Sequence, residues 1–409
     1  MEFSTRIANQ LMLEGIQNKL SKNIVSSPLS INVALNMATA GSKGRTLERL
    51  LGPKMSDEIN AKSRKMMAVT EGGGSSKDVS NGPILTMVNG AWVDQGFPLV
   101  DKYKEHILKD IFKGEANNVD FEDKANNGES MKGQGWASDS PGLLANEVVD
   151  EINSWANIAS RGLIKNLLQH GSISRDTIVI LANGLYFKGI WDSGYKFDAQ
   201  MTKYRKFYLL NGRVVLVPFM TSKKKENYYY KKFDGFKVLK IPYQSCQANN
   251  FSMYFFLPDD RDGLQNLLGK FNSNSGFLNE KHFKLAKEEL SEFWIPKFKF
   301  SFDFDVLKVM DDMGESLSSI ENLRDLSEMM HISEDAPYFI SKMVQKVYIE
   351  VDEKGTKATS IIGMGFRLMC ERWPKISFVA DHPFVCMIRE EGSGLVLFTG
   401  TVMNPLQKG

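Results

Sequence analysis

Few side chains in this chain of 409 residues are spaced as an enzyme or a metal site requires. The five histidines are His106, His170, His282, His331 and His382. None of them falls in an HExxH pattern or lies beside a cysteine at the spacing of metal ligands. The sequence also lacks a GxSxG nucleophile elbow, a phosphate-binding P-loop and a GxGxxG turn after a predicted strand. We therefore predict no catalytic residue, no metal ligand and no cofactor, which favours a binding or inhibitory function.

Three isolated features keep a chemical alternative open. Cys370 lies in a charged segment, but only Arg372 is close enough in sequence to lower the pKa of its thiol and make it a nucleophile. His382 precedes Pro383 at the start of a predicted strand, where we expect a structural role. The basic and aromatic run at 222–232 has a composition that suits nucleic acid, but a solvated face is the simpler interpretation.

The overall charge excludes partners that are recruited by a strong electric field. The chain carries 51 basic and 49 acidic residues, a net charge of +2, so we expect neither nucleic acid nor a membrane as a partner. No stretch approaches the ~20 apolar residues of a membrane span. The three cysteines are far apart in sequence, and the first residues lack the apolar core of a secretory signal. We expect a cytoplasmic or nuclear location, with extracellular release by a non-classical route as the alternative.

Helical patterns dominate the first part of the chain and strand patterns the rest, with no linker between them, which predicts one α+β domain. Residues 23–44 begin a helix at Ser27-Pro28. Residues 176–187 are nearly all apolar, as in a strand covered on both faces. The strand-like runs 384–390 and 395–403, joined by Gly392-Ser393-Gly394, predict a hairpin. The polar, glycine-rich residues 126–144 are typical of a surface insertion that precedes a helix.

The stretch from 350 to 378 combines a strand pattern with the character of a loop. It follows a predicted strand at 343–351, and the residues Glu353-Lys354-Gly355 are typical of a turn or hinge. One side of a period-two pattern then runs small to apolar along Thr356, Ala358, Ser360, Ile362, Met364, Phe366 and Leu368. Two glycines weaken the pattern as a strand, and Pro374 ends it. An edge strand and a long exposed loop both remain open from the pattern alone.

Four separated segments resemble the serpin family, most closely the plant-type serpins. Residues 23–51 resemble the family's second helix, and ANGLYFKGIWD at 182–192 resembles the strand with its Asn and Trp. VYIEVDEKGTKA at 347–358 resembles the hinge of the reactive-centre loop, and 378–405 resembles the C-terminal strands, with FVADHPF in the plant-like form. The segments occur in the family's order and extend the resemblance over nearly the whole chain.

The resemblance implies a single-domain serpin fold over residues 1–409, with helices packed on a large mixed β-sheet, smaller sheets and an exposed reactive-centre loop at 354–377. It implies an irreversible protease inhibitor that is not an enzyme. A target serine protease would cut the loop and become acyl-linked to it, and insertion of the cut loop into the large sheet would trap the protease. Cysteine proteases are a further target class. The chain itself is expected to be a monomer.

The resemblance also assigns residues to this mechanism. The hinge would comprise Glu353, Gly355, Thr356, Ala358 and Ser360. The region where the sheet opens would comprise Ser27, Ser30, Asn183, Trp191 and Gln345. Gln345 stands where the family has a histidine, and it can hydrogen-bond but not become charged. On insertion the alternating residues would bury one face, which favours insertion by ~25 cal/mol per Å² of apolar area.

Counting along the loop by the family's length places the reactive bond at Met369-Cys370. A long apolar side chain before the bond suits the pocket of chymotrypsin-like or elastase-like proteases. Plant-type serpins often carry Leu-Arg here, so cleavage between Arg367 and Leu368 by a trypsin-like enzyme is the alternative bond. Papain-like enzymes are a further target class.

Two more features depart from the family's pattern. Ile361 is bulky where the hinge region normally keeps Ala, Thr or Ser, and the insertion at 126–144 lies just before the helix that covers the large sheet. The alternative function is therefore a non-inhibitory serpin that serves as a binding or storage protein and is cut as an ordinary substrate.

Overall fold

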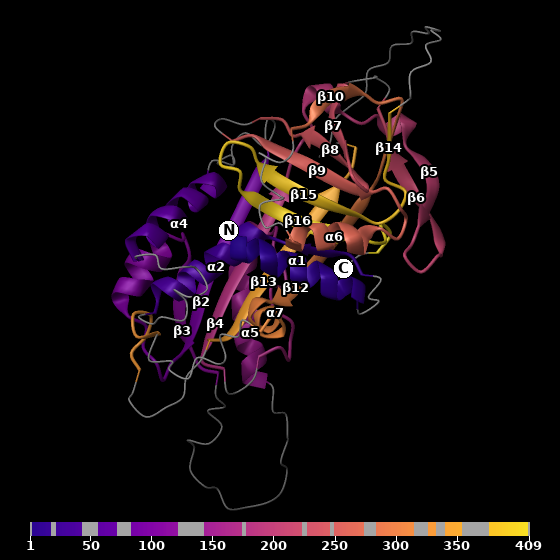
Figure 1. Ribbon diagram of the computed structural model, residues 1–409. Helices are drawn as coiled ribbons and strands as arrows, with labels where there is room; N and C mark the ends of the chain where they lie inside the picture. Colours follow the sequence, from indigo (N-terminus) through magenta and orange to yellow (C-terminus); the bar gives the residue numbers. More distant parts are fainter. Residues whose placement is uncertain are drawn as a thin grey trace, which may run out of the picture.

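The computed structural model describes twelve ranges of the chain. They are residues 2–17, 22–42, 56–71, 83–121, 143–173, 177–222, 227–245, 249–273, 284–314, 326–332, 340–353 and 376–407. The chain folds as an α+β domain with strands in three sheets and helices on their faces (Figure 1). This arrangement confirms the α+β fold class predicted from the sequence.

The longest parallel strand pair among the described residues, β4 with β13, lies inside a five-stranded sheet with the order β12-β13-β4-β2-β3. Its strands are β12 (Phe298–Asp305), β13 (Ile340–Val351), β4 (Val179–Lys188), β2 (Ile84–Asp94) and β3 (Glu115–Val119). The pairs β13–β4 and β2–β3 are parallel, whereas β12–β13 and β2–β4 are antiparallel. The sheet is therefore mixed, as predicted, and occupies the lower half of Figure 1.

Two further sheets form the upper part of the molecule (Figure 1). The seven-stranded sheet has the order β1 (Ile24–Ser26), β16 (Val396–Val402), β15 (Phe384–Glu390), β9 (Phe251–Pro258), β8 (Phe236–Pro242), β7 (Asn227–Phe233) and β10 (Ala286–Glu289). All its pairs are antiparallel, and β15 and β16 form the hairpin expected from the sequence. The four-stranded sheet has the order β14 (Ser377–Val379), β11 (Glu292–Pro296), β6 (Val214–Met220) and β5 (Lys203–Tyr208).

The helices belong mainly to the first part of the chain. They are α1 (Glu2–Gln17), α2 (Pro28–Ala40), α4 (Ser56–Glu71), α5 (Leu143–Ala159), α6 (Leu264–Ser273) and α7 (Val306–Asp312), with a π-helical segment at Tyr103–Lys109 and single 3-10 turns at Ser193–Tyr195 and Ala199–Met201. Among the described residues, no helix is both long and apolar enough to cross a bilayer.

Both faces of the five-stranded sheet are covered. On one face α5 packs through Val149 and Ile152 against Trp92 and Ile180, and Trp155 meets the edge of Trp92 at 4.8 Å between ring centroids. On the other face the sheet packs against α2 and against the seven-stranded sheet. Coverage of both faces explains why β4 is a nearly unbroken apolar run in the sequence.

Two boundaries predicted from the sequence are wrong by one or two residues. Ser377, placed at the end of the loop, is the first residue of β14, because it pairs in parallel with Glu292 of β11. Leu143 and Leu144, placed in the surface insertion, already belong to α5. Leucine and alanine favour helix, and no glycine or proline occurs between Gly142 and the end of α5. The rest of the insertion and residues 354–375 lie outside the described residues.

We predict that a single methyl group at Gly400 will destabilise the fold. A Cβ there would lie 2.3 Å from the carbonyl oxygen of Ile24 and 2.9 Å from the Cα of Val25, both backbone atoms of the neighbouring strand β1. Gly400→Ala should cost about 1–3 kcal/mol, as overpacking does, measured from the midpoint of urea unfolding. The control Gly269→Ala adds a methyl group on α6 with no atom within 4 Å, and should be neutral or stabilising. Equal midpoints for the two variants would contradict the close contact of β1 and β16.

Candidate functional site: the junction of β4 and β13

The ladder between β4 and β13 ends before either strand does. Its last pair is Tyr186 with Tyr348, although β4 continues to Lys188 and β13 to Val351. Over these last residues β13 keeps its pairing with β12 on the other side. The two central strands therefore form a fork that opens towards the point where the chain leaves β13 for the predicted loop.

The chain beyond the fork is anchored at Glu353. The Glu353 carboxylate accepts hydrogen bonds from the Thr202 hydroxyl at 2.6 Å and from the Lys297 ammonium at 2.7 Å, and its side chain is 10% exposed. Burial opposes ionisation of this carboxyl, but the hydrogen bonds from Lys297 and Thr202 outweigh it and lower the pKa of Glu353. The start of the predicted hinge is thus held by a charged, largely buried contact.

Trp191 holds the residue before Glu353. Its indole Nε1 donates to the carbonyl oxygen of Asp352 at 2.8 Å, and its ring stacks on Tyr243 with 4.5 Å between centroids and 9° between planes. The indole is buried, so its N–H needs a partner inside the protein and finds it in this backbone carbonyl. Trp191, predicted from the sequence to belong to the opening region, therefore lies at the upper end of the sheet beside the hinge.

Gln345 joins the middle of β13 to the start of α2. Its side-chain oxygen accepts from the backbone N–H of Ser27 at 2.9 Å, and its Nε2 donates to the carbonyl oxygen of Ser27 at 3.1 Å. Ser27 is the N-cap of α2, and its hydroxyl accepts from the backbone N–H of Ser30 at 3.1 Å. A glutamine amide offers a donor and an acceptor together, so it satisfies both backbone groups of Ser27 without carrying a charge.

A row of buried amides crosses the sheet at the same level. Asn183 of β4 is the register partner of Gln345 on one side and of Asn89 on the other. The Asn183 amide nitrogen donates to the side-chain oxygen of Asn89, and the Asn89 amide nitrogen donates to the carbonyl oxygen of Phe112 at 2.7 Å. Within the described residues, the side-chain oxygens of Asn183 and Ser30 are buried without a hydrogen-bond partner. Buried acceptors of this kind are costly and rare, so they mark a place that is not fully satisfied in the closed sheet.

The structure brings the five predicted opening residues to the upper and middle parts of the β4–β13 junction, but it does not describe the loop. Gly355, Thr356, Ala358, Ser360, Ile361, Arg367, Leu368, Met369 and Cys370 lie outside the described residues. Three contact residues were missed from the sequence, namely Asn89, Thr202 and Lys297. Only contacts between segments distant in sequence, which no local pattern encodes, could have revealed them.

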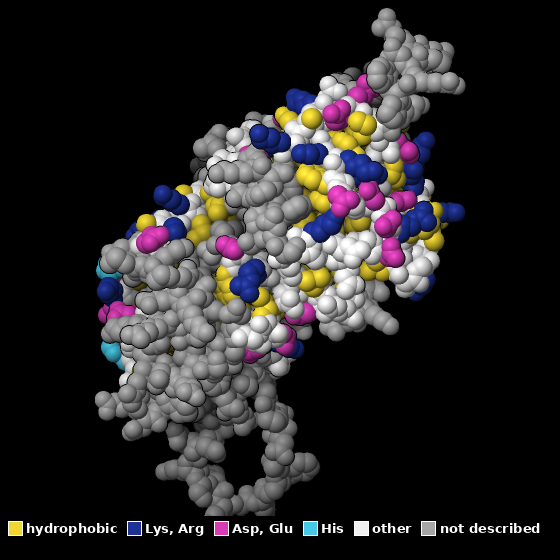
Figure 2. All heavy atoms as spheres, in the orientation of Figure 1, with side chains coloured by type: hydrophobic (Ala, Val, Ile, Leu, Met, Phe, Trp, Pro, Cys, Tyr) yellow, Lys and Arg dark blue, Asp and Glu magenta, His cyan; other side chains and the backbone are white. Residues whose placement is uncertain are grey.

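Other candidate groups have structural surroundings. Both ring nitrogens of His382 are engaged, with the Asp381 carboxylate at 2.8 Å and the Pro258 carbonyl at 2.9 Å, in keeping with a structural role. Burial raises the pKa of the Cys386 thiol to about 12, which leaves it un-ionised. No group of three potential metal ligands occurs among the described residues. On the face shown in Figure 2, basic and acidic side chains are intermingled over the described surface.

We predict that replacing Gln345 with leucine will destabilise the protein by about 2 kcal/mol, because the buried Ser27 N–H then loses its acceptor. The Ser27 carbonyl keeps the N–H of Ile31 as a donor, so only one group is orphaned. The midpoint of urea unfolding measures the effect. The matched control Gln10→Leu removes a half-buried amide of α1 that, among the described residues, bonds only to the Glu14 side chain one turn away, and should change stability by under ~0.5 kcal/mol. A Gln345→Leu variant as stable as this control would show that the amide does not anchor β13.

Glu353 should add a pH-dependent contribution to stability. Because its pKa is lower in the folded chain than the ordinary value of 4.5, the ionised form stabilises the fold above about pH 4.5, and this contribution is lost as the pH falls through the lowered pKa. Glu353→Gln should cost about 1 kcal/mol at pH 7, since Lys297 is partly exposed. As the pH falls from 7 to 3, the urea unfolding midpoints of Glu353→Gln and of the unchanged protein should converge. The control Glu58→Gln breaks an exposed pair with Lys62 and should leave the pH profile unchanged.

Comparison with known proteins agrees with this geometry. The chain matches the family described as Serpin (serine protease inhibitor) over residues 2–138 and 144–405. It is 38% identical to Serpin-ZX of Arabidopsis thaliana, covering 99% of this chain and 97% of that protein. It is also 37% identical to the probable non-inhibitory serpin-Z5 of the same plant, covering 94% of this chain and 79% of that protein.

A solved structure shows the same architecture over the full length. The native stressed conformation of AtSerpin1 from Arabidopsis superposes with a TM-score of 0.78 at 34% identity, and the match covers 100% of both chains. The similarity thus extends to the sheet that contains the β4–β13 junction. This chain therefore belongs to the serpin family, as shown by its matching sequence together with its helices on a mixed five-stranded sheet and its two further sheets.

Proposed function

We propose that this protein inhibits serine endopeptidases irreversibly, by inserting its cut reactive-centre loop between β4 and β13. Membership of the serpin family supports protease inhibition in general. The observation that carries the specific mechanism is the parallel pairing of β4 and β13 in the middle of the sheet, with the predicted loop leaving directly from the end of β13. Loop insertion of this kind is the strand-addition mode already known for serpins.

The topology favours this insertion on elementary grounds. A chain that leaves the end of β13 and turns back beside it runs antiparallel to β13, and therefore antiparallel to β4 as well. Insertion replaces one parallel ladder by two antiparallel ladders, which are slightly more stable per residue. It also adds hydrogen bonds without breaking either neighbouring pair, β12–β13 or β2–β4.

The loop sequence suits the two faces that insertion would create. Thr356, Ala358 and Ser360 alternate with Lys357 and Thr359, so one set meets the face that carries Gln345 and the other meets the α5 face. Ile361 belongs to the opposite set, so its bulk would fall on the α5 face and not against α2.

The proposed reactive bond remains Met369-Cys370, which favours chymotrypsin-like or elastase-like targets, with Arg367-Leu368 and a trypsin-like target as the alternative. A second candidate function is a non-inhibitory serpin that is cut without trapping the protease. Its supporting observation is the 37% identity to a relative named as probably non-inhibitory. Ile361 and Gln345, which depart from the family's pattern, would be its structural basis.

The protein should form covalent complexes with a protease and should tolerate no charge at the first inserted position. Incubation with chymotrypsin should give a complex that survives SDS, and loop cleavage should raise the melting temperature strongly. Thr356→Arg should abolish the complex, because it would bury an unpaired charge. The matched control Thr359→Arg places the same charge among the loop residues that would face α5. This variant should inhibit far better than Thr356→Arg.

The outcome also distinguishes the candidates. Trypsin in place of chymotrypsin tests the alternative bond, and sequencing the released peptide locates the cut. Cleavage without complex formation and without a rise in melting temperature would establish the non-inhibitory function. Inhibition that survives Thr356→Arg would rule out strand insertion.

A further inference from the structure

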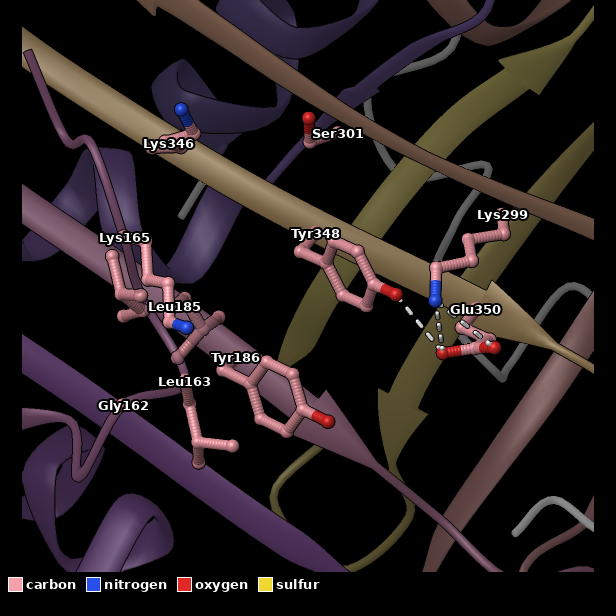
Figure 3. Close-up of a pocket in the computed structure, with 11 residues that line it drawn as sticks. Gly162, Leu163, Lys165, Leu185, Tyr186, Lys299, Ser301, Lys346, Tyr348 and Glu350 are labelled. Atoms are coloured by element: carbon pink, nitrogen blue, oxygen red, sulfur yellow. Dashed lines mark hydrogen bonds and ion pairs between the residues drawn. The ribbon is translucent and has the colours of Figure 1, made fainter. Parts of the chain in front are cut away.

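A cavity of about 640 Å³ opens on the α5 face of the five-stranded sheet, at the level of the fork (Figure 3). Its walls are the segment that follows α5, with Gly162 and Lys165, and outward-facing residues of β4, β13 and β12. The volume is within the range of sites that hold small organic molecules, roughly 300–1,000 Å³. The cavity spans the two strands that the proposed insertion separates.

The charged groups around the cavity are mainly basic. Lys165, Lys299 and Lys346 line it, and Glu350 is the one acidic residue among its lining residues. The Glu350 carboxylate already accepts from the Tyr348 hydroxyl at 2.9 Å and pairs with Lys299 at 3.3 Å, as the dashed lines in Figure 3 show. The acidic charge is therefore neutralised locally, and the cavity keeps an excess of positive charge from Lys165 and Lys346.

The unused polar groups of the cavity can all donate hydrogen bonds. Three of these groups have no hydrogen-bond partner within the described part of the chain, namely the Lys165 ammonium, the Tyr186 hydroxyl and the Ser301 hydroxyl. The Lys346 ammonium donates one hydrogen bond, to the Asn166 carbonyl oxygen at 2.7 Å. Burial raises the pKa of Tyr186, so its phenol stays protonated at neutral pH and remains a donor. A ligand that satisfies these groups must present acceptor oxygens, preferably on an anion.

Two tyrosine rings form the floor between the strands. Tyr186 and Tyr348 stack with 5.8 Å between centroids and 14° between planes, and they lie side by side in Figure 3. They are register partners, the last pair of the β4–β13 ladder. Parallel rings of this kind present an extended aromatic surface on which another planar ring can pack in an offset arrangement.

We propose that this cavity binds a planar aromatic anion, with its ring packed on Tyr186 and Tyr348 and its carboxylate, sulfate or phosphate group held by Lys165 and Lys346. The ring matches the tyrosine pair and the anion matches the excess of donors. A bare inorganic anion would leave the aromatic surface uncovered, and a neutral aromatic would leave the lysines unpaired.

Such a ligand would also hold the sheet closed, a consequence that rests on the proposed function. A strand inserted between β4 and β13 would move Tyr186 and Tyr348 apart by about 4.8 Å, the spacing of neighbouring strands. The aromatic floor exists only while the two strands are paired. A molecule bound across it therefore favours the closed sheet, and should slow insertion and convert the inhibitor towards a substrate.

Binding to the uncut protein tests the site directly. The probe is 8-anilinonaphthalene-1-sulfonate, titrated by fluorescence, with neutral N-phenyl-1-naphthylamine and inorganic sulfate as comparison ligands. We expect the sulfonate to bind at least tenfold more tightly than either. Lys165→Glu and Tyr186→Leu should each raise Kd at least tenfold. Lys308→Glu on α7 and Tyr204→Leu on β5 should leave it unchanged, because both residues are exposed and neither lines the cavity. Equal Kd values for all four variants, or equal binding of the neutral ligand, would overturn the proposal.

A second arm separates this proposal from the proposed function. Loop-cut protein that shows the rise in melting temperature should lose the probe, and saturating probe should increase the fraction of uncut protein turned over as substrate by chymotrypsin. Cut protein that has gained stability yet binds the probe with unchanged Kd would refute the coupling to the sheet. Absence of any rise in melting temperature would refute the proposed inhibition, while the Kd values of the uncut variants would still decide the binding site.

Discussion

The strands β4 and β13 pair in parallel in the middle of the five-stranded sheet. This pair lies between two antiparallel pairs, and its ladder stops at Tyr186 and Tyr348 although both strands continue. A parallel pair of this kind can accept one antiparallel strand without disturbing its other neighbours, and the chain that leaves β13 is suitably placed to supply it. The fork is therefore the part of the sheet closest to the point where the chain leaves β13.

Polar contacts fix the two strands of this junction to their surroundings at two levels. Glu353 and Trp191 fix the chain just beyond β13, Gln345 fixes the middle of β13 to the cap of α2, and Asn183 joins β4 to β2. Each contact is worth only a few kcal/mol, and the unpaired oxygens of Asn183 and Ser30 show that the closed state is not fully satisfied. On the proposed mechanism, the closed sheet is stable while the loop is intact and less stable than a sheet with one more strand. The tyrosine-floored cavity lies across the same fork, so a ligand there would act on the same equilibrium.

Sequence patterns predicted the elements better than their contacts. The unbroken apolar run of β4, the Ser27-Pro28 helix start and the final hairpin are local signals, and each appears as predicted. The ability of Gln345 to hydrogen-bond was also foreseen, but its partner was not, because the Ser27 backbone lies over three hundred residues away in sequence. Asn89, Thr202 and Lys297 were missed for the same reason. The cavity could not be predicted at all, since its walls come from four separate segments.

The structure of the protein cut at its loop would show which strands pair after cleavage. A crystal structure of that form should show a sixth strand between β4 and β13, antiparallel to both, with Thr356 and Ala358 on the face that carries Gln345. The pairs β12–β13 and β2–β4 should keep their present registers. A cut protein in which Tyr186 and Tyr348 are still register partners would contradict insertion of the loop between β4 and β13.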